Sequence, residues 1–290
     1  ARTLGSVSMP DGQNVNAAVG TFTGAFTSLG IDDNADATAI TIDSSEHVGI
    51  GTTSPDGTLH IHSATAGSVD ANTDADDLVV ENSGHAGINI LSPDANRSAI
   101  QFGHTSDNLQ LQIRHDGNTS LSQIISDDAL TFNVGDGTER MRIDANGHIT
   151  KPTQPAFLVK LSSEQANLTN DSAHNTFAFA TEVFDQNADF ASNTFTAPVT
   201  GRYQLSFAIY LQSIDTDATF FYVALRTSNR DVFFIVDPNF SADLGYYHVA
   251  GSLLSDMDAN DTATVTYVQS SGTAQVDANA HSYFSGFLSC

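Results

Sequence analysis

The fold of this chain can be deduced from FTAPVTGRYQLSFAIYL, residues 195–211. Between Tyr203 and Leu211 large apolar side chains alternate with smaller or polar ones, and a period of two predicts a β-strand with one buried face. Pro198 and Gly201 predict a turn that leads into this strand. Similar alternating runs, separated by Gly, Asn, Asp and Ser, recur along the chain, and helical periodicity is nearly absent. The sequence therefore predicts an all-β protein.

The same stretch resembles the signature of the globular heads of complement component 1q. Gly251-Ser252, which is expected to open a strand, Asn260-Asp261 and the closing segment 283–288 (YFSGFL) fit that family in order and spacing. The resemblance covers residues 156–290 and implies a ten-stranded jelly-roll β-sandwich, related to tumour necrosis factor, that assembles as a tight trimer and binds partners. The residues that carry this trimer and core signature are Phe195, Pro198, Gly201, Tyr203, Phe207, Tyr283, Phe284, Gly286 and Phe287. Phe284 and Phe287 are expected on opposite faces of the last strand, one in the core and one at the trimer axis.

A second resemblance lies nearer the N-terminus. The phrases VGIGTTSP (48–55), LHI (59–61) and ERMRIDANG (139–147) are similar to phrases repeated in phage tail fibres and related appendages. Such phrases also occur in bacterial surface proteins of phage-like origin. This resemblance covers about residues 40–150 and implies a virion fibre.

Four segments follow from these observations. Residues 1–45 are expected to form an N-terminal attachment or shaft segment, 46–150 a β-rich fibre shaft, 151–155 a linker, and 156–290 the jelly-roll head. Two prolines stiffen the linker, and most of the 18 phenylalanines follow it. Because residues 1–155 contain few large apolar side chains, we expect three chains to intertwine and share one core.

A short internal repeat lies within the shaft. ITIDSSEHV (40–48) lines up with MRIDANGHI (141–149). Each copy predicts a strand, a turn led by an aspartate and a second strand, which indicates one module used twice.

The chain is strongly acidic, with a formal net charge of -24, and its acids are spread along its whole length. This charge argues against binding to nucleic acid, which requires Lys and Arg, and against adhesion to anionic membranes. No segment has the roughly 20 consecutive apolar residues of a membrane span. Cys290 is the single cysteine, so an intrachain disulfide is impossible.

Two aspartates are candidates for a calcium site. Asp237 and Asp243 lie in the loop before Gly251, where the resemblance implies calcium near the trimer axis; carboxylate oxygens are the ligands that calcium prefers. Asp215 and Asp217 are weaker candidates, for which a plain turn is the better interpretation.

A separate candidate for calcium lies nearer the N-terminus. The segment 70–81 has calcium-loop spacing but carries Ala75 where the loop needs glycine, so a solvated acidic loop is the alternative. No cofactor other than calcium is indicated.

His60 and His62 share one face of a predicted strand and could form a ligand pair, presented as a ring by three chains. The alternative is a pair of polar residues on an exposed strand face.

Motifs for catalysis are absent from the sequence: it contains no GxSxG and no phosphate-binding glycine loop. We therefore expect no enzyme but a homotrimeric, structural and adhesive virion fibre of a phage tail or capsid, acting outside cells. Its N-terminal segment would contact other virion proteins, and its head would bind a glycan or protein receptor on the host surface. The rival functions are a glycan-degrading phage spike, a bacterial surface adhesin of similar architecture, and a purely structural spacer with no receptor role.

Overall fold

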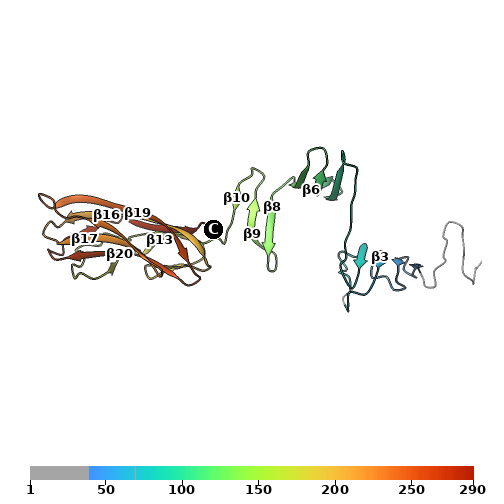
Figure 1. Cartoon of the computed structure of the whole chain (residues 1–290), viewed down its shortest axis with the longest axis horizontal. Helices are drawn as coiled ribbons and strands as arrows, with labels where there is room; N and C mark the ends of the chain where they lie inside the picture. Colours follow the sequence, from blue (N-terminus) through green and yellow to red (C-terminus); the bar gives the residue numbers. More distant parts are fainter. Residues whose placement is uncertain (1–38, 69) are drawn as a thin grey trace, which may run out of the picture. The chain divides into compact units, whose positions relative to one another are not determined.

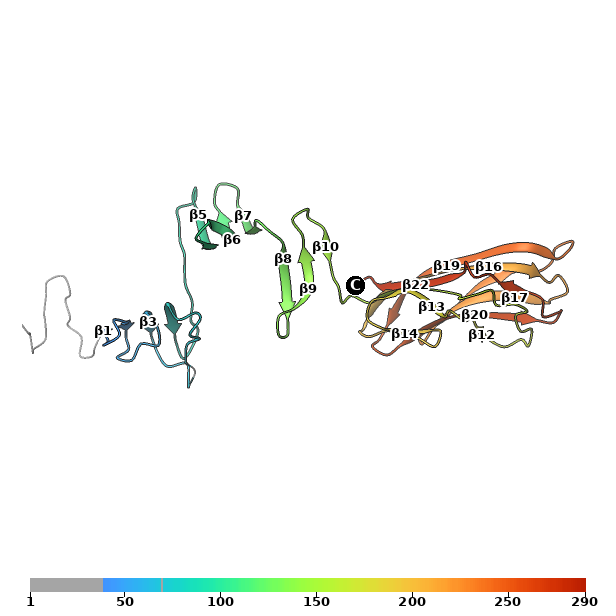
Figure 2. The same ribbon diagram turned by 180° about the vertical axis from the view of Figure 1, so that it is seen from behind.

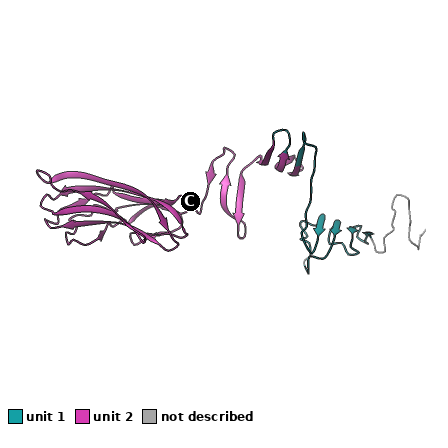
Figure 3. Ribbon diagram, in the orientation of Figure 1, with its two compact units in different colours: residues 1–98, 116–119 teal, residues 99–115, 120–290 magenta. Residues whose placement is uncertain are grey.

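The computed structural model describes residues 39–68 and 70–290, and these residues form β-strands, turns and loops without a helix. The all-β prediction is therefore confirmed for the described residues. None of them belongs to a helix that could span a membrane. The chain divides into two compact units (Figure 3): residues 1–98 with 116–119, and residues 99–115 with 120–290. Most of the predicted attachment segment, residues 1–38, lies outside the described residues.

The first unit contains a four-stranded sheet in the order β1-β2-β3-β4. Its strands are β1 (Ile40–Ile42), β2 (Val48–Ile50), β3 (Leu59–His62) and β4 (Leu78–Glu81). β1 and β2 form an antiparallel hairpin, whereas β3 lies parallel to both β2 and β4. The parallel pairs need the longer connections that the loops 51–58 and 63–77 provide.

Two further three-stranded sheets follow along the chain, and both can be seen in Figure 2. One has the order β5-β6-β7, formed by β5 (Arg97–His104), β6 (Asp107–Asp116) and β7 (Leu121–Ser126). The other has the order β10-β9-β8, formed by β8 (Leu130–Val134), β9 (Thr138–Ile143) and β10 (Ile149–Thr150). Each sheet consists of consecutive antiparallel or hairpin-connected strands, as expected where short strands alternate with turns.

These small sheets leave their apolar side chains in solvent. Among the described residues, the buried hydrophobic core begins at Phe157 and includes no earlier residue. Large apolar side chains that are exposed instead include Ile40, Ile42, Ile88, Leu91, Phe102, Ile113, Leu121, Ile124, Phe132, Val134 and Ile149. A soluble chain seldom exposes so many large apolar residues in one region unless another surface covers them.

The internal repeat has the same structure in both copies. Asp43 follows β1 and Asp144 follows β9, and each carboxylate accepts hydrogen bonds from the backbone N–H groups two and four residues later. Each turn returns to an antiparallel strand. Glu46 and Gly147, at equivalent positions, both have a left-handed backbone, with φ of 67° and 84°. The prediction of one module used twice is confirmed for this turn.

The head is a sandwich of two antiparallel sheets, which form separate layers in Figure 1. The front sheet, as we name it, has the order β13-β11-β22-β16-β19, with the short β21 paired to β16. Its strands are β11 (Ala156–Lys160), β13 (Thr181–Asp185), β16 (Gly201–Ile214), β19 (Leu244–Met257), β21 (Asp277–Ala278) and β22 (Tyr283–Leu288).

The back sheet has the order β14-β15-β20-β17-β18, with the short β12 paired to β20. Its strands are β12 (Asn175–Thr176), β14 (Phe190–Ala191), β15 (Thr194–Thr196), β17 (Phe220–Thr227), β18 (Asp231–Val236) and β20 (Thr262–Ser270). The two main paths contain five strands each, and the short β21 and β12 bring each sheet to six. The predicted jelly-roll-like arrangement of two sheets is confirmed.

The core between the sheets is rich in phenylalanine. The alternating residues of the quoted stretch, from Tyr203 to Leu211, all point inward and are almost fully buried. The ring of Phe157 contacts those of Phe190, Phe195 and Phe284, with centroids 4.7 to 5.3 Å apart. Ring contacts at this spacing add stability beyond the burial of apolar area.

One strand differs from the sequence prediction. Gly251 was expected to open a strand, but it lies in the middle of the 14-residue β19. A Cβ at this position would lie 2.2 Å from the ring of Phe234 and 2.7 Å from the ring of Phe207. Glycine is therefore required by close packing in the core and does not mark a strand end here.

Candidate functional site

The outer face of the front sheet is the first candidate for function. Along β22 the side chains alternate between the core and this face, so that Phe284 is fully buried whereas Phe287 is 50% exposed. The expectation that these two rings point to opposite faces is confirmed. Leu254 of β19 and Phe184 of β13 are exposed to the same extent.

Strand register places these side chains on one surface. Gln204 of β16 pairs with Phe287 on one side and with Leu254 on the other. In the next row, Leu158 pairs with Phe184. Residues that are paired in neighbouring strands project to the same side of a sheet. We call the four apolar residues Leu158, Phe184, Leu254 and Phe287 the apolar face.

Small side chains line the surface beside the apolar face. Ser206 pairs with both Ser285 and Ser252, so small side chains occupy three adjacent strands. A hollow of about 460 Å³ lies there, lined by residues that include Leu158, Phe184 and Phe287. An exposed apolar surface bordered by small side chains is suited to the close approach of another protein surface.

The remaining signature residues belong to the core or to its edge. Phe195, Tyr203, Phe207 and Phe284 are buried, and Gly286 has no room for a Cβ because the side chains of Leu205 and Phe157 occupy that space. Pro198 and Gly201 belong to the segment before and at the start of β16, and Tyr203 donates a hydrogen bond from its hydroxyl to Val199 O at 2.8 Å. Tyr283 lies partly exposed on the outer face. The signature therefore combines core residues with residues of the exposed face.

A second exposed surface lies on the back sheet. Phe220, Tyr222 and Phe233 form a chain of ring contacts, with centroids 5.8 and 5.2 Å apart, and His174 packs against Tyr222. Burial lowers the pKa of His174, and the nearby positive charge of Arg226 lowers it further. Ile235, which pairs with Tyr222, is 73% exposed. We call Phe220, Tyr222, Phe233 and Ile235 the aromatic patch; no pattern identified in the sequence predicted it.

The two candidate calcium ligands have different surroundings. Asp243 accepts hydrogen bonds from the backbone N–H and hydroxyl of Thr216 through Oδ1, and from Gln275 Nε2 through Oδ2. The hydrogen bond from the Thr216 N–H is the largest cause of its lowered pKa. Asp237 accepts a bond from Asn239 N–H. Within one chain neither residue belongs to a cluster of three acidic, histidine or cysteine ligands in the described part.

Asp215 and Asp217 belong to a turn, which was the preferred interpretation. Asp215 is almost fully buried and accepts hydrogen bonds from the backbone N–H groups of Asp217 and Thr273. These bonds connect the end of β16 to the loop that follows β20. In the segment 70–81, Glu81 lies 3.2 Å from His60 Nε2 and 3.6 Å from His62 Nε2, and the calcium loop stays a prediction.

His60 and His62 share one strand face, as predicted, and their rings are 5.6 Å apart. The expectation of an exposed pair is wrong for His60, which is 1% exposed. The described residues contain one cluster of three potential metal ligands, formed by Asp56, His60 and Glu81. The sequence did not predict this cluster, because its members come from separate segments of the chain. Asp56 lies in the loop before β3, and Glu81 lies in β4, which is parallel to β3.

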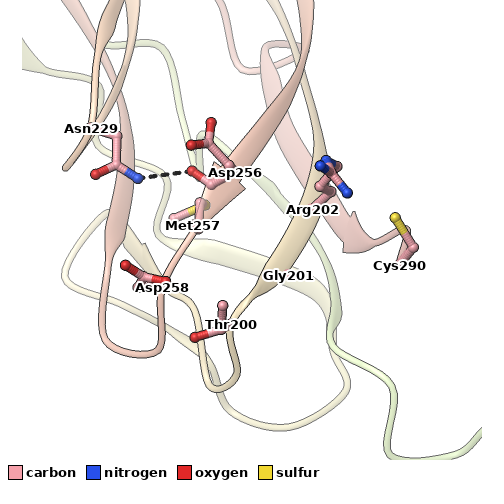
Figure 4. Close-up of a pocket in the computed structure, with 8 residues that line it drawn as sticks. All are labelled: Thr200, Gly201, Arg202, Asn229, Asp256, Met257, Asp258 and Cys290. Carbon is pink, nitrogen blue, oxygen red and sulfur yellow. Dashed lines mark hydrogen bonds between the residues drawn. The ribbon is translucent and has the colours of Figure 1, made fainter.

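A pocket at one end of the sandwich is shown in Figure 4. It has a volume of about 240 Å³ and is lined by Thr200, Gly201, Arg202, Asn229, Asp256, Met257, Asp258 and Cys290. Asn229 donates a hydrogen bond to Asp256 O at 2.9 Å, and Arg230 forms an ion pair with the Asp256 carboxylate at 2.5 Å. These contacts connect the loop between β17 and β18 to the end of β19, which indicates a structural role for Asn229 and Asp256.

The geometry of residues 156–290 is that of a two-sheet jelly roll with an exposed apolar sheet face. The family model of the C1q domain matches residues 156–289, so this part of the chain is a C1q-like globular domain. Such domains are commonly trimeric and typically serve structural and binding functions. The resemblance inferred from the sequence is confirmed for the head.

Solved structures similar to this chain include the globular domain of zebrafish complement 1qA protein, at 18% identity, and murine APRIL at pH 8.0, at 9% identity. Each comparison covers 47% of this chain and 98% of the other, with a TM-score of 0.34. No curated protein matches the chain.

Proposed function

We propose that this chain is the subunit of a homotrimeric adhesive fibre, carried on a phage tail or capsid, whose C1q-like head binds a receptor on the host surface. The N-terminal segment would attach the fibre to other virion proteins, and the strands between residues 46 and 150 would form an intertwined shaft. The main supporting observation is the distribution of apolar residues: the described residues before Phe157 bury none in a core and expose many. Three chains that wrap around one another would cover these side chains.

The apolar face of the head supports the same assembly. Leu158, Phe184, Leu254 and Phe287 lie on one surface and would be removed from water at a trimer axis. Burial of such residues supplies about 25 cal/mol per Å² of apolar area. The head would then hold the three chains in register while the weaker shaft pairs its strands.

The trimer can be tested with two matched substitutions. Phe287 and Phe233 are both phenylalanines that are 50% exposed, but Phe287 belongs to the apolar face and Phe233 to the aromatic patch on the other sheet. We expect sedimentation of the unaltered chain to give three times the 30.7 kDa mass of one chain. Phe287→Asp should give monomers that keep their β-sheet circular dichroism, and Phe233→Asp should remain trimeric. A monomeric unaltered chain at micromolar concentration would refute the proposed assembly.

Receptor binding is assigned to the aromatic patch. A contiguous exposed apolar surface of this kind marks an interaction site more often than a random surface does, and aromatic side chains supply a large share of binding energy at interfaces. Because Phe233→Asp is expected to preserve the trimer, its effect on adsorption separates binding from assembly. We expect particles with this substitution to adsorb to host cells at least tenfold more slowly. Normal adsorption would exclude the patch as the receptor site.

Calcium at Asp237 and Asp243 remains part of the proposal, as a cation held where three chains meet. The ionised carboxylate of Asp243 is compatible with this role, although its oxygens also bond within the chain. Chelation with EGTA should lower the melting temperature or trimer content. If neither changes, calcium has no part in the assembly.

The rival function of a glycan-degrading spike has its own test. Loss of a host polysaccharide on incubation with the purified protein would favour the spike over the adhesive fibre.

A further inference from the structure

The sheet β1-β2-β3-β4 contains a cluster of ionisable side chains that the proposed function does not use. Because β3 and β4 are parallel and in register, His62 pairs with Glu81 and His60 with Val79. Residues in register project to the same side, and residues two apart share a face. His60, His62 and Glu81 therefore meet on one surface of the sheet. The loop between β2 and β3 adds Asp56, whose backbone N–H donates a hydrogen bond to His60 Nδ1 at 3.2 Å.

The second nitrogen of His60 is buried without a hydrogen-bond partner. The residue is 1% exposed, and Nε2 has no partner even though Glu81 Oε2 lies 3.2 Å away. The two atoms are close but are not aligned as a hydrogen bond. A buried polar atom that lacks a partner destabilises the fold, and a bound ion is one of the groups that can supply the missing partner.

We propose that this cluster binds one divalent transition-metal ion of the zinc class per chain. His60 Nε2 and Glu81 Oε2 are the two central ligands. Two atoms bound to one tetrahedral zinc at about 2.0–2.1 Å lie about 3.3 Å apart, and the observed separation of 3.2 Å agrees with this value. His62 Nε2 lies 3.6 Å from the same Glu81 oxygen and 3.2 Å from Thr65 Oγ1. It would supply a third ligand by exchanging its contact with Thr65 for the ion.

Asp56 is a positioning residue in this site. An imidazole that binds a metal through Nε2 carries its hydrogen on Nδ1, and that hydrogen needs an acceptor. The Asp56 carboxylate lies 3.8 Å from His60 Nδ1 and can accept it, in place of the present bond from the Asp56 backbone. A carboxylate behind a metal-binding histidine fixes the ring and raises its basicity.

The chemistry of the ligands selects among cations. Imidazole nitrogen suits zinc, copper, nickel and cobalt, whereas calcium requires oxygen ligands. The site would also stabilise a sheet that has almost no core, because a bound ion connects β3, β4 and the loop before β3. Because the site exists only in the folded chain, the free energy of metal binding adds to the stability of the fold.

The test uses the full chain after removal of metals with a chelator. Isothermal titration with Zn²⁺ should show one ion bound per chain, and Co²⁺ should give the visible absorption of a tetrahedral complex. Glu81→Gln preserves the size of the side chain and an oxygen for the bond from Ala66 N–H; we expect it to weaken Zn²⁺ binding at least tenfold. Asp56→Asn should weaken it about 10–100-fold.

His148→Gln is the matched control, because His148 also lies beside an aspartate, at 2.9 Å from Asp144, but in an exposed turn. This variant should bind Zn²⁺ as the unaltered chain does. Because His60→Gln could unfold the sheet, the conclusion depends on the Glu81 and Asp56 variants. Equal Zn²⁺ binding by Glu81→Gln and the unaltered chain, equal binding of Ca²⁺ and Zn²⁺, or one ion per three chains would each overturn the proposal.

Discussion

Gly251 shows how one residue can limit the packing of the whole head. It lies in β19 opposite Phe207, and the rings of Phe207 and Phe234 occupy the space of a Cβ. We predict that Gly251→Ala lowers the free energy of unfolding by about 1–3 kcal/mol, because both rings must leave their packed positions. Denaturation with guanidinium chloride measures this change.

Gly245 provides the control for that experiment. It belongs to the same strand, its backbone is not left-handed, and no atom lies within 4 Å of a Cβ at this position. Gly245→Ala should therefore change stability by less than about 0.5 kcal/mol. If both substitutions had the same effect, close packing would not be the reason for glycine at 251.

Several partly or fully exposed aspartates make the stability of the protein depend on pH. Hydrogen bonds lower the pKa of Asp43, Asp107, Asp144, Asp171 and Asp243 below the ordinary value of 3.8. The largest cause is a backbone N–H for Asp43 and Asp243, and the His148 side chain for Asp144. Just below pH 3.8 the unfolded chain binds more protons than the folded chain, so stability rises with pH in that range.

We predict that the melting temperature falls when the pH is lowered from 4 through the depressed pKa values, and that it depends little on these groups above pH 5. Burial raises the pKa of Asp189, and this group has the opposite effect. Asp243→Asn should melt earlier at pH 7 but lose less stability on acidification. Identical acid slopes for this variant and the unaltered chain would contradict the assignment to Asp243.

The repeated turn allows the two copies of one element to be compared. Glu46 and Gly147 occupy equivalent left-handed positions, and a Cβ at Gly147 would meet no atom within 4 Å. The cost of a larger residue there is therefore conformational, about 1 kcal/mol. Gly147→Glu should destabilise the β9–β10 hairpin by this amount, whereas Gly147→Asn should cost less because asparagine tolerates left-handed backbone.

Amide hydrogen exchange in this hairpin is the appropriate measurement, because a local change need not alter global unfolding. The N–H groups of Asp144 and His148 should exchange about fivefold faster in Gly147→Glu, because a loss of about 1 kcal/mol corresponds to that factor. In the other copy, Glu46→Gly should slow exchange at Asp43 and His47. Unchanged exchange in both copies would show that the left-handed residue carries no strain.

The elements that the sequence predicts best are those that depend on local pattern. The alternation from Tyr203 to Leu211 predicts a strand and its buried face, and aspartate followed by small polar residues predicts the repeated turn. Contacts between distant segments have no such local signal. The burial of His60 depends on Glu81 and Asp56, and the extension of β19 through Gly251 depends on rings from two other strands.

At the level of the whole molecule, the head (residues 156–290) has a buried core, whereas the described residues before it have none. All buried hydrophobic residues of the described chain lie at or after Phe157, and most of them form one cluster. A chain needs enough buried apolar area to offset the conformational entropy that is lost on folding. The head satisfies this requirement within one chain, whereas the small sheets before it do not.

We therefore predict that a chain of residues 151–290 folds alone, with dispersed amide resonances and cooperative unfolding, and that a chain of residues 1–150 does not. The reason is that a small sheet is stable in water only when its apolar face is covered, and the described residues among 1–150 cover none within one chain. Adding a foreign trimerisation domain to residues 1–150 should restore protease resistance, because three chains held at high local concentration can cover one another's exposed isoleucines. Cooperative unfolding of monomeric residues 1–150 would show that these strands need no partner, and the proposed intertwined shaft would then lose its physical basis.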